Sequence, residues 1–345
     1  MTAGPVRLLV SAGEVSGDRL AAAFVRDLRS RSPNLLTAGC GGIRLAQAGT
    51  ELWLDQGRIN FVGWSGPARH LLRLWLDQRR FLAKATDWKP EAVLLVDSPG
   101  WNRPLLAWAI RRKIPVHWMA PPQLWAWRQR PAGYLAGISV QPLFAFETHS
   151  LLDRGAKVRW HGLPRDAVPR SSADGPIALL PGTREALWRR HLPLFAQALR
   201  ISGRSGAVAV PSSPSPQFVG ICQTFGLVWE HASTLLSRAS ACIAVPGTGC
   251  LDAVRHGVPT LVAAAPGPLD SWLARRLLAP GSKVLPNRIL ERMLVEERYG
   301  MEASPATLAS RLEATIARRQ VFEDTVEELE TRLGPRQEFP ADPWN

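Results

Sequence analysis

Short apolar runs alternate with longer segments of mixed polarity along this chain. The runs are rich in β-branched residues and are bounded by glycine or proline, which is typical of buried parallel strands. The predicted strands lie at 6–13, 92–97, 114–118, 175–182, 206–211, 241–247 and 258–265. The segments between them predict helices, among them 19–30, 67–85 and 186–200. This alternation predicts an α/β protein built on parallel sheets.

A polar stretch interrupts the alternation near the middle of the chain. It reads "RDAVPRSSADGP" over residues 165–176, and its prolines and glycine indicate a linker. The strand–helix pattern restarts after it, so we predict two Rossmann-like domains, over 1–168 and 172–303. Residues 304–345 predict a helical tail. One arrangement left open is that this tail packs back on the first domain.

Charge narrows the choice of partners. The formal net charge is +13 and the isoelectric point is near 10.8, which favours an anionic partner. Nucleic acid, an anionic membrane surface and a phosphorylated substrate all meet that description. The chain has two tyrosines, and it lacks zinc-ligand spacing and an aromatic RNA-binding strand. We therefore expect no nucleic-acid partner.

The N-terminal stretch and the cysteines predict where the protein works. The first apolar run spans about five residues and acidic residues follow it, which argues against a signal peptide. No stretch approaches the roughly 18 apolar residues of a membrane-spanning helix. The four cysteines lack metal-ligand spacing, so we expect reduced thiols, no metal site and a cytoplasmic protein.

Residues 61–84 combine apolar and basic side chains. Leu72, Trp75 and Leu76 lie among several arginines there, a composition typical of a helix that rests on an anionic membrane surface. The alternative is an ordinary helix that packs on its own sheet.

The candidate functional residues lie where predicted strands end. Ligands of parallel α/β sheets bind at the carboxyl ends of the strands, so these positions are the ones to examine. The first strand ends in "SAGEVSGD", where Gly13, Ser16 and Gly17 would let a ligand approach the backbone. In that motif Asp18 could cap the next helix. The alternative is a glycine-rich turn that only starts a helix.

Another strand ends in "LLVDSPGWN", which places Asp97 directly after four apolar residues. A carboxylate in that position can accept a proton from an alcohol. The alternative is that Asp97 caps the following helix through its backbone amides.

The residues that follow two predicted strands of the second domain favour a nucleotide-binding site. In "VPGTGCLD", Gly247 and Thr248 can present backbone amides to a diphosphate, and Asp252 could bond to a ribose hydroxyl. In "LLPGTR", Arg184 could pair with a phosphate through two hydrogen bonds.

These motifs follow one another in a recognisable order. "SAGExSGD", "GCGGxxLxxxGxE", "VDSPGWN", "QLWAWRQ", "AFE", "LLPGTR", "GTxxLD" and "LPN" run from about Leu8 to Asn287. Together they resemble the lipid-A-disaccharide synthase family. The resemblance implies a GT-B fold and inverting glycosyl transfer without a metal or another cofactor.

The resemblance also implies a reaction and its place. The family moves 2,3-diacylglucosamine from its UDP derivative to the 6-hydroxyl of 2,3-diacylglucosamine 1-phosphate and releases UDP. It works at the cytoplasmic face of the inner membrane, and a homodimer is left open. Carried over by position, Asp97 is implied as the base. The implied UDP site comprises Arg184, Gly247, Thr248, Asp252 and Asn287.

The loop "APPQLWAWRQRP", residues 120–131, lies in a stretch that contains no acidic residue from 98 to 146. Tryptophans and arginines suit a cleft that meets acyl sugars and phosphate. The predicted acceptor cleft is lined by Trp125, Trp127, Arg128, Gln129 and Glu147. The alternative is that the two tryptophans are core wedges between the domains.

Several positions depart from the family pattern. Ser65–Gly66 replaces a Glu-Val pair, Leu163 replaces a histidine, Leu187 replaces an acidic residue and Asp252 replaces a glutamate. These departures leave open a low-activity homologue, or a related UDP-sugar transferase with a different acceptor.

Overall fold

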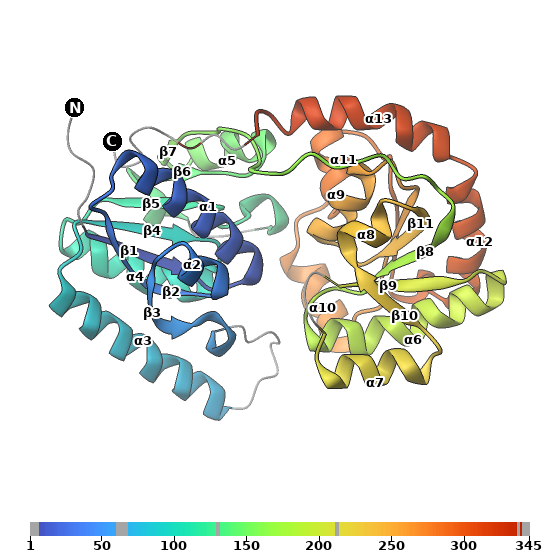
Figure 1. Ribbon diagram of the computed structural model, residues 1–345, viewed down its shortest axis with the longest axis horizontal. Helices are drawn as coiled ribbons and strands as arrows, with labels where there is room; N and C mark the ends of the chain where they lie inside the picture. The colour runs from blue at the N-terminus through green and yellow to red at the C-terminus, as the bar shows by residue number, and fades with distance from the viewer. Residues whose placement is uncertain (1–6, 60–67, 129–131, 211–213, 337–338, 340–345) are drawn as a thin grey trace. The chain divides into compact units, whose positions relative to one another are not determined.

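The computed structural model describes residues 7–59, 68–128, 132–210, 214–336 and 339, with the backbone alone at 68–71 and 268–269. Ser65, Gly66 and Gln129, which the sequence singled out, lie outside the described residues. The chain forms two compact units (Figure 1). Unit 1 comprises Met1–Trp125, Arg130–Arg165 and Pro335–Asn345, and unit 2 comprises Ala126–Gln129 and Asp166–Gly334.

Unit 1 is built on a parallel sheet whose described strands follow the order β3-β2-β1-β4-β5-β6-β7. The strands are β1 Arg7–Ala12, β2 Leu36–Gly41, β3 Glu51–Asp55, β4 Ala92–Val96, β5 Val116–Met119, β6 Ser139–Gln141 and β7 Lys157–Val158. The helices are α1 Val15–Arg31, α2 Ile43–Gln47, α3 Ala68–Trp88, α4 Pro99–Arg111 and α5 Thr148–Leu152. Short 3-10 turns lie at η1 Gln56–Arg58, η2 Leu124–Ala126, η3 Gly133–Leu135 and η4 Ala145–Glu147.

Unit 2 repeats the plan with a parallel sheet of described strands in the order β10-β9-β8-β11-β12-β13. The strands are β8 Gly175–Leu180, β9 Gly206–Val210, β10 Val228–His231, β11 Ala239–Ala244, β12 Thr260–Ala264 and β13 Glu296–Tyr299. The helices are α6 Glu185–Ser202, α7 Pro216–Thr224, α8 Ala232–Leu236, α9 Thr248–Arg255, α10 Pro268–Leu277, α11 Leu285–Leu290, α12 Pro305–Ile316 and α13 Arg319–Arg332. A 3-10 turn, η5, spans Gly300–Glu302.

Side chains of unit 1 alternate between two hydrophobic clusters, as the two-residue period of a strand requires. In β1, Leu8 and Val10 belong to the cluster that contains Phe24 of α1, whereas Leu9 belongs to the cluster that contains Trp108 of α4. The sheet is therefore covered by apolar side chains on both faces. This explains why its strands read as continuous apolar runs.

The predicted α/β class is confirmed, and each of the seven predicted strands corresponds to a strand of the structure. The sequence missed strands that carry few consecutive apolar residues. These include the glycine-containing "LTAGCG" of β2 and the charged "EERY" of β13. Such strands are specified by pairing with their neighbours rather than by their own composition.

The tail predicted over 304–345 divides between the two units. Helices α12 and α13 belong to unit 2, where α12 packs beside α6. The segment from Pro335 belongs to unit 1. There the ring of Phe339 makes an edge contact with Phe24, with ring centres 5.4 Å apart.

Candidate active site

Asp97 lies at the carboxyl end of β4, in the middle of the unit 1 sheet. Its amide donates to the carbonyl of Met119 (3.0 Å), which ties it to the neighbouring strand β5. The cap position of α4 belongs to Ser98, and the Ser98 side chain makes no capping hydrogen bond. The half-buried Asp97 thus precedes the helix cap, and its role as a base stays a prediction.

A buried chain of hydrogen bonds holds the Asp97 backbone. The Trp101 indole N–H donates to Ser11 Oγ (3.1 Å), and Ser11 Oγ donates to Asn102 Oδ1 (2.7 Å). Asn102 Nδ2 then donates to the carbonyl oxygens of Asp97 (2.7 Å) and Val96 (3.2 Å). Because each buried polar group has a partner, the network stabilises one position of the Asp97 turn.

The backbone is strained at this turn. Asp97 and Ser98 have φ values of 49° and 46°, and Ala120, which follows the neighbouring strand β5, has 50°. All three lie in the left-handed region that non-glycine residues rarely adopt. Such residues persist only where the surrounding structure holds them, and they cluster at active sites. Gly13 permits the arrangement, because a Cβ there would lie 2.5 Å from Ser98 Oγ.

The "SAGEVSGD" motif serves both folding and the site. Helix α1 begins at Val15, four residues earlier than predicted, so Ser16 and Gly17 lie in its first turn, exposed and buried respectively. Asp18 does not cap this helix. Its carboxylate accepts from the amides of Gly42 (2.7 Å), Arg44 (3.1 Å) and Leu45 (3.1 Å), and so caps α2. These hydrogen bonds join the "SAGExSGD" motif to the "GCGGxxLxxxGxE" motif.

Glu147 is buried and fixes the loop that contains Trp125. Its Oε1 accepts from the Trp125 indole N–H (3.1 Å), and its Oε2 accepts from the amides of Leu143 and Phe144 (3.2 Å each). Burial raises the pKa of Glu147 to about 7, although these donors act to lower it, and the Asp97 carboxylate raises it further. Glu147 therefore lies within electrostatic reach of Asp97.

The predicted acceptor cleft is divided between the units. Trp125 belongs to unit 1, whereas Trp127 and Arg128 belong to unit 2. Trp127 pairs with Leu278 in an isolated β-bridge, and the Arg128 amide donates to the carbonyl of Leu277 (2.8 Å). This segment therefore pairs with the residues at the end of α10, which sequence reasoning did not predict.

In unit 2 the two glycine-bounded strand ends lie side by side. Strands β8 and β11 are paired, and the Val245 amide donates to the Leu180 carbonyl (3.0 Å). Arg184 is the exposed N-cap residue of α6, and Gly247 is the N-cap residue of α9. The Arg184 side chain makes no capping hydrogen bond to α6, and Gly247 has no side chain that could cap α9. Two helix N-termini thus meet at one sheet edge, which suits a diphosphate.

The other two residues predicted to bind UDP differ in how exposed and how fully hydrogen-bonded their side chains are. Asp252 lies in α9 with half of its side chain exposed, 3.6 Å from Arg255. Asn287 is buried, and its amide group is fully used. Its Nδ2 donates to Val295 O and Glu297 Oε1, and its Oδ1 accepts from the amides of Leu294 and Val295. The Asn287 side chain therefore ties α11 to β13, and its contact with UDP stays a prediction.

Sequence reasoning missed three positioning residues. Ser11 and Asn102 stood inside quoted motifs, but no pattern revealed that Ser11 of β1 bonds to Asn102 of α4. His191 is buried in α6. Its Nδ1 lies 2.8 Å from Leu187 O, and its Nε2 accepts from the Ala265 amide (3.2 Å). The ring therefore anchors the loop after β12, and burial lowers its pKa.

Helix α3 has two different faces. Phe81 and Ala85 are buried in the core of unit 1. Leu72, Trp75 and Leu76 are 59%, 49% and 40% exposed. One face therefore packs on the protein, as the ordinary interpretation predicted, while the other presents apolar side chains outward.

Comparison with known proteins identifies the family. The family model described as lipid-A-disaccharide synthetase matches residues 8–337. The chain is 30% identical to the lipid-A-disaccharide synthase of Myxococcus xanthus, over 96% of this chain and 94% of that protein. It is 28% identical to the Pseudomonas syringae enzyme, over 89% and 88%.

The chain belongs to the lipid-A-disaccharide synthetase family. It is accordingly a hexosyltransferase of lipid A biosynthesis, as the motifs predicted. Solved structures support the GT-B fold. The calicheamicin glycosyltransferase CalG4 matches with a TM-score of 0.58 and 14% identity, over 95% of this chain and 93% of that one. A Staphylococcus aureus MnaA structure with UDP matches with a TM-score of 0.62 and 11% identity, over 95% and 92%.

Among the described residues, no helix is long and apolar enough to cross a membrane.

Proposed function

We propose that this protein transfers 2,3-diacylglucosamine from UDP-2,3-diacylglucosamine to the 6-hydroxyl of 2,3-diacylglucosamine 1-phosphate. Membership of the family supports a UDP-sugar donor and a lipid acceptor. The observation that carries the residue assignment is the Asp97 turn, where the backbone of a carboxylate residue at the end of β4 is held by Asn102 and Met119.

In the proposed reaction, Asp97 accepts the proton of the acceptor 6-hydroxyl as its oxygen attacks the anomeric carbon of the donor. The bond from that carbon to the diphosphate breaks on the opposite face, which inverts the configuration. Negative charge then collects on the UDP diphosphate. We assign its stabilisation to Arg184 and to the backbone amides at the start of α9, next to Gly247 and Thr248, and their positions at two helix N-termini support this.

The other predicted residues divide between donor and acceptor. Gly13, Ser16 and Gly17 belong to the unit that carries Asp97, so we assign them to the acceptor side. Asp252 remains the proposed ribose contact, because half of its side chain is exposed. Glu147 acts through Trp125, whose indole it anchors.

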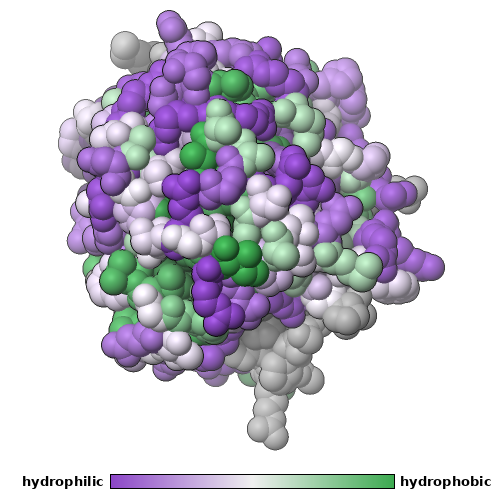
Figure 2. Space-filling view, turned by 90° about the vertical axis from the view of Figure 1, so that its right-hand side faces the viewer, coloured by the Kyte–Doolittle hydropathy of each residue, from purple (hydrophilic) through white to green (hydrophobic). Residues whose placement is uncertain are grey.

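A peripheral position on the cytoplasmic face of the inner membrane completes the proposal. The exposed apolar face of α3 supports it, together with Arg79, whose guanidinium lies 4.6 Å from the centre of the Trp75 ring. On the side of the molecule shown in Figure 2, hydrophilic residues predominate and hydrophobic ones form small separate areas. The exposed apolar side chains of α3 and the neighbouring Arg79 are the reason that we propose α3 as the membrane contact.

The test is an assay of the purified protein with UDP-2,3-diacylglucosamine and 2,3-diacylglucosamine 1-phosphate in detergent. We expect equal amounts of UDP and disaccharide. UDP release only with another sugar acceptor would contradict the acceptor assignment and favour a related UDP-sugar transferase. No UDP release with any acylated sugar would overturn the proposal.

A further inference from the structure

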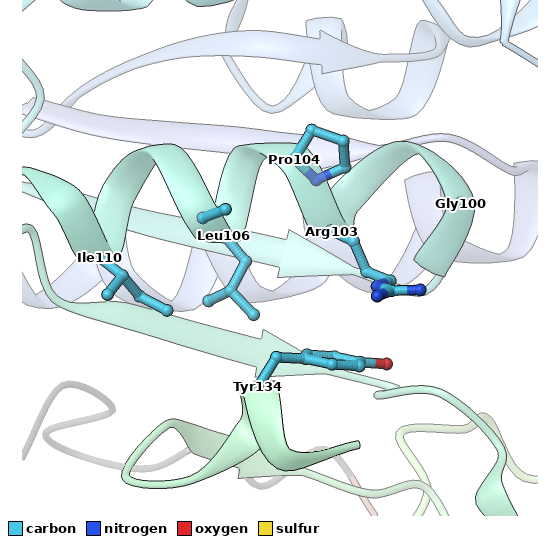
Figure 3. A pocket seen from close by; sticks show the side chains of 7 residues that line it. Gly100, Arg103, Pro104, Leu106, Ile110 and Tyr134 are labelled. Atoms are coloured by element: carbon cyan, nitrogen blue, oxygen red, sulfur yellow. The ribbon is translucent and has the colours of Figure 1, made fainter. Parts of the chain in front are cut away.

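A groove of about 400 Å³ runs along the outer face of α4 in unit 1 (Figure 3). Its lining comprises Gly100, Arg103, Pro104, Leu106, Ala107, Ile110 and Tyr134. Arg103, Leu106, Ala107 and Ile110 are spaced three or four residues apart, so they share one face of the helix. Apolar side chains therefore form most of the lining, a composition that suits a hydrocarbon chain.

One end of the groove carries a fixed positive charge. The Arg103 guanidinium lies over the Tyr134 ring, 4.6 Å from its centre, and this stacking orients its planar group (Figure 3). Among the described residues, no carboxylate lies within ion-pair distance of Arg103. The exposed guanidinium therefore keeps its donors for an anion that it could bind through two hydrogen bonds.

We propose that this groove binds the acceptor, with Arg103 on the acceptor phosphate and one acyl chain along α4. The inference rests on the proposed function and names a substrate site for it. Two observations support it: the groove begins close to Asp97 in the chain, and the positive charge of Arg103 complements a phosphate. Gly100, at one end of the groove, lies three residues after Asp97. A phosphorylated acyl sugar presents an anion and a hydrocarbon chain together, which is the combination that the lining matches.

The size of the groove fits one acyl chain. From Gly100 to Ile110 the helix rises about 15 Å, at about 1.5 Å per residue. A hydrocarbon chain of about that length can therefore lie along this face of the helix.

Direct binding tests the inference without turnover. We would titrate short-chain and long-chain 2,3-diacylglucosamine 1-phosphate, and the same sugars without phosphate, into the full protein in detergent. Arg103→Gln should weaken binding of the phosphorylated sugars by about tenfold and leave the others unchanged. The matched control is Arg111→Gln, which removes the same charge from the same helix outside the groove lining.

Ala107→Trp tests the hydrocarbon part. Ala107 is exposed, so the larger side chain fills the groove without entering the core. It should weaken binding of long-chain sugars more than short-chain ones, by about fourfold for each methylene excluded. Ala314→Trp, at an exposed position of α12 in unit 2, is the control.

If Arg103→Gln binds the phosphorylated sugars as tightly as the wild type does, or loses equal affinity for both sugar series, the inference is overturned. A loss of affinity in Ala107→Trp that does not depend on chain length would also overturn it. Failure of the wild-type protein to bind any of these sugars would overturn it too. If the groove variants weaken only vesicle binding, the groove is a membrane contact and the proposal is wrong. The proposed function is judged by a different measurement, the production of UDP and disaccharide by the wild type. If both products form, the proposed function stands even where the groove proposal fails. If neither forms, the proposed function fails as well.

Discussion

At the scale of single residues, the site depends on carboxylates held by their neighbours. Asp97 is positioned through its backbone by Asn102 and Ser11, and Glu147 is buried under three N–H donors. The first carboxylate remains half-buried, whereas the second is almost excluded from water. We therefore expect their removal to affect different properties, catalysis for Asp97 and pH-dependent stability for Glu147.

Asp97→Asn should lower turnover by about 10²- to 10⁴-fold while UDP affinity is unchanged, because the amide cannot take the acceptor proton. Steady-state UDP release and isothermal titration with UDP are the two measurements. Asp87→Asn, at an exposed position near the end of α3, makes the same chemical change away from the site. Turnover near the wild-type value in folded Asp97→Asn would exclude the base assignment.

Glu147 should make the protein less stable as pH rises. Burial raises the pKa of Glu147 from 4.5 to about 7, so between these values the folded protein keeps a proton that the unfolded chain releases. The free energy of unfolding should therefore fall over this pH range by about 3 kcal/mol and level off above it. Urea denaturation at several pH values should show the fall for wild type and not for Glu147→Gln. If the free energy of unfolding depends on pH in the same way for wild type and Glu147→Gln, Glu147 is not the cause of the fall.

At the scale of elements, helix ends and helix faces carry the proposed binding. The α6 N-terminus begins at Arg184 beside the β11 strand end, and α3 turns three apolar side chains outward. Each element also has an ordinary structural role, since one face of each helix is buried. Variants on the exposed part of either helix should therefore change binding without unfolding the protein.

Arg184→Ala should weaken UDP binding by about tenfold, because it removes a charge-assisted contact to the diphosphate. Arg200→Ala, at an exposed position in the last turn of the same helix, is the control for loss of charge. Isothermal titration with UDP measures both. The same UDP affinity in Arg184→Ala and wild type would place the phosphate site elsewhere.

Replacing Leu72, Trp75 and Leu76 with serine should remove the part of vesicle binding that survives high salt. These side chains are exposed, so the variant should keep its fold, and it loses the apolar area that would enter the bilayer interface. Flotation with vesicles that contain anionic lipid, at 1 M salt, gives the measurement. If the triple variant floats with the vesicles as well as the wild type does, α3 is not the membrane contact.

At the scale of the whole molecule, the net charge of +13 should draw the protein to anionic surfaces over a distance set by salt. The screening length falls from about 10 Å at 0.1 M to about 3 Å at 1 M salt. Vesicle binding should therefore decrease with salt and reach a nonzero level in the wild type. Binding that does not change with salt would show that charge plays no part, and vesicles of neutral lipid are the control.

The sequence alone determined the fold class, most of the central strands and the family. Buried parallel strands must be apolar on both faces, so they can be read from composition, and Gly- and Trp-containing motifs keep their order along the chain. Asp97, Arg184 and Gly247 could be found in this way because each lies in the loop that follows an apolar run.

Tertiary structure decided what those motifs contact. Only pairing of β1 with β4 brings Ser11 to Asn102, and only the return of the chain brings Asp18 to the start of α2. The same holds for Asn287, whose motif suggested a ligand but whose side chain is used within unit 2. These partners lie far apart in sequence, and hydrogen bonding between them leaves no local pattern. That is why the sequence located the candidate site while the folded chain decided which of its residues are available for chemistry.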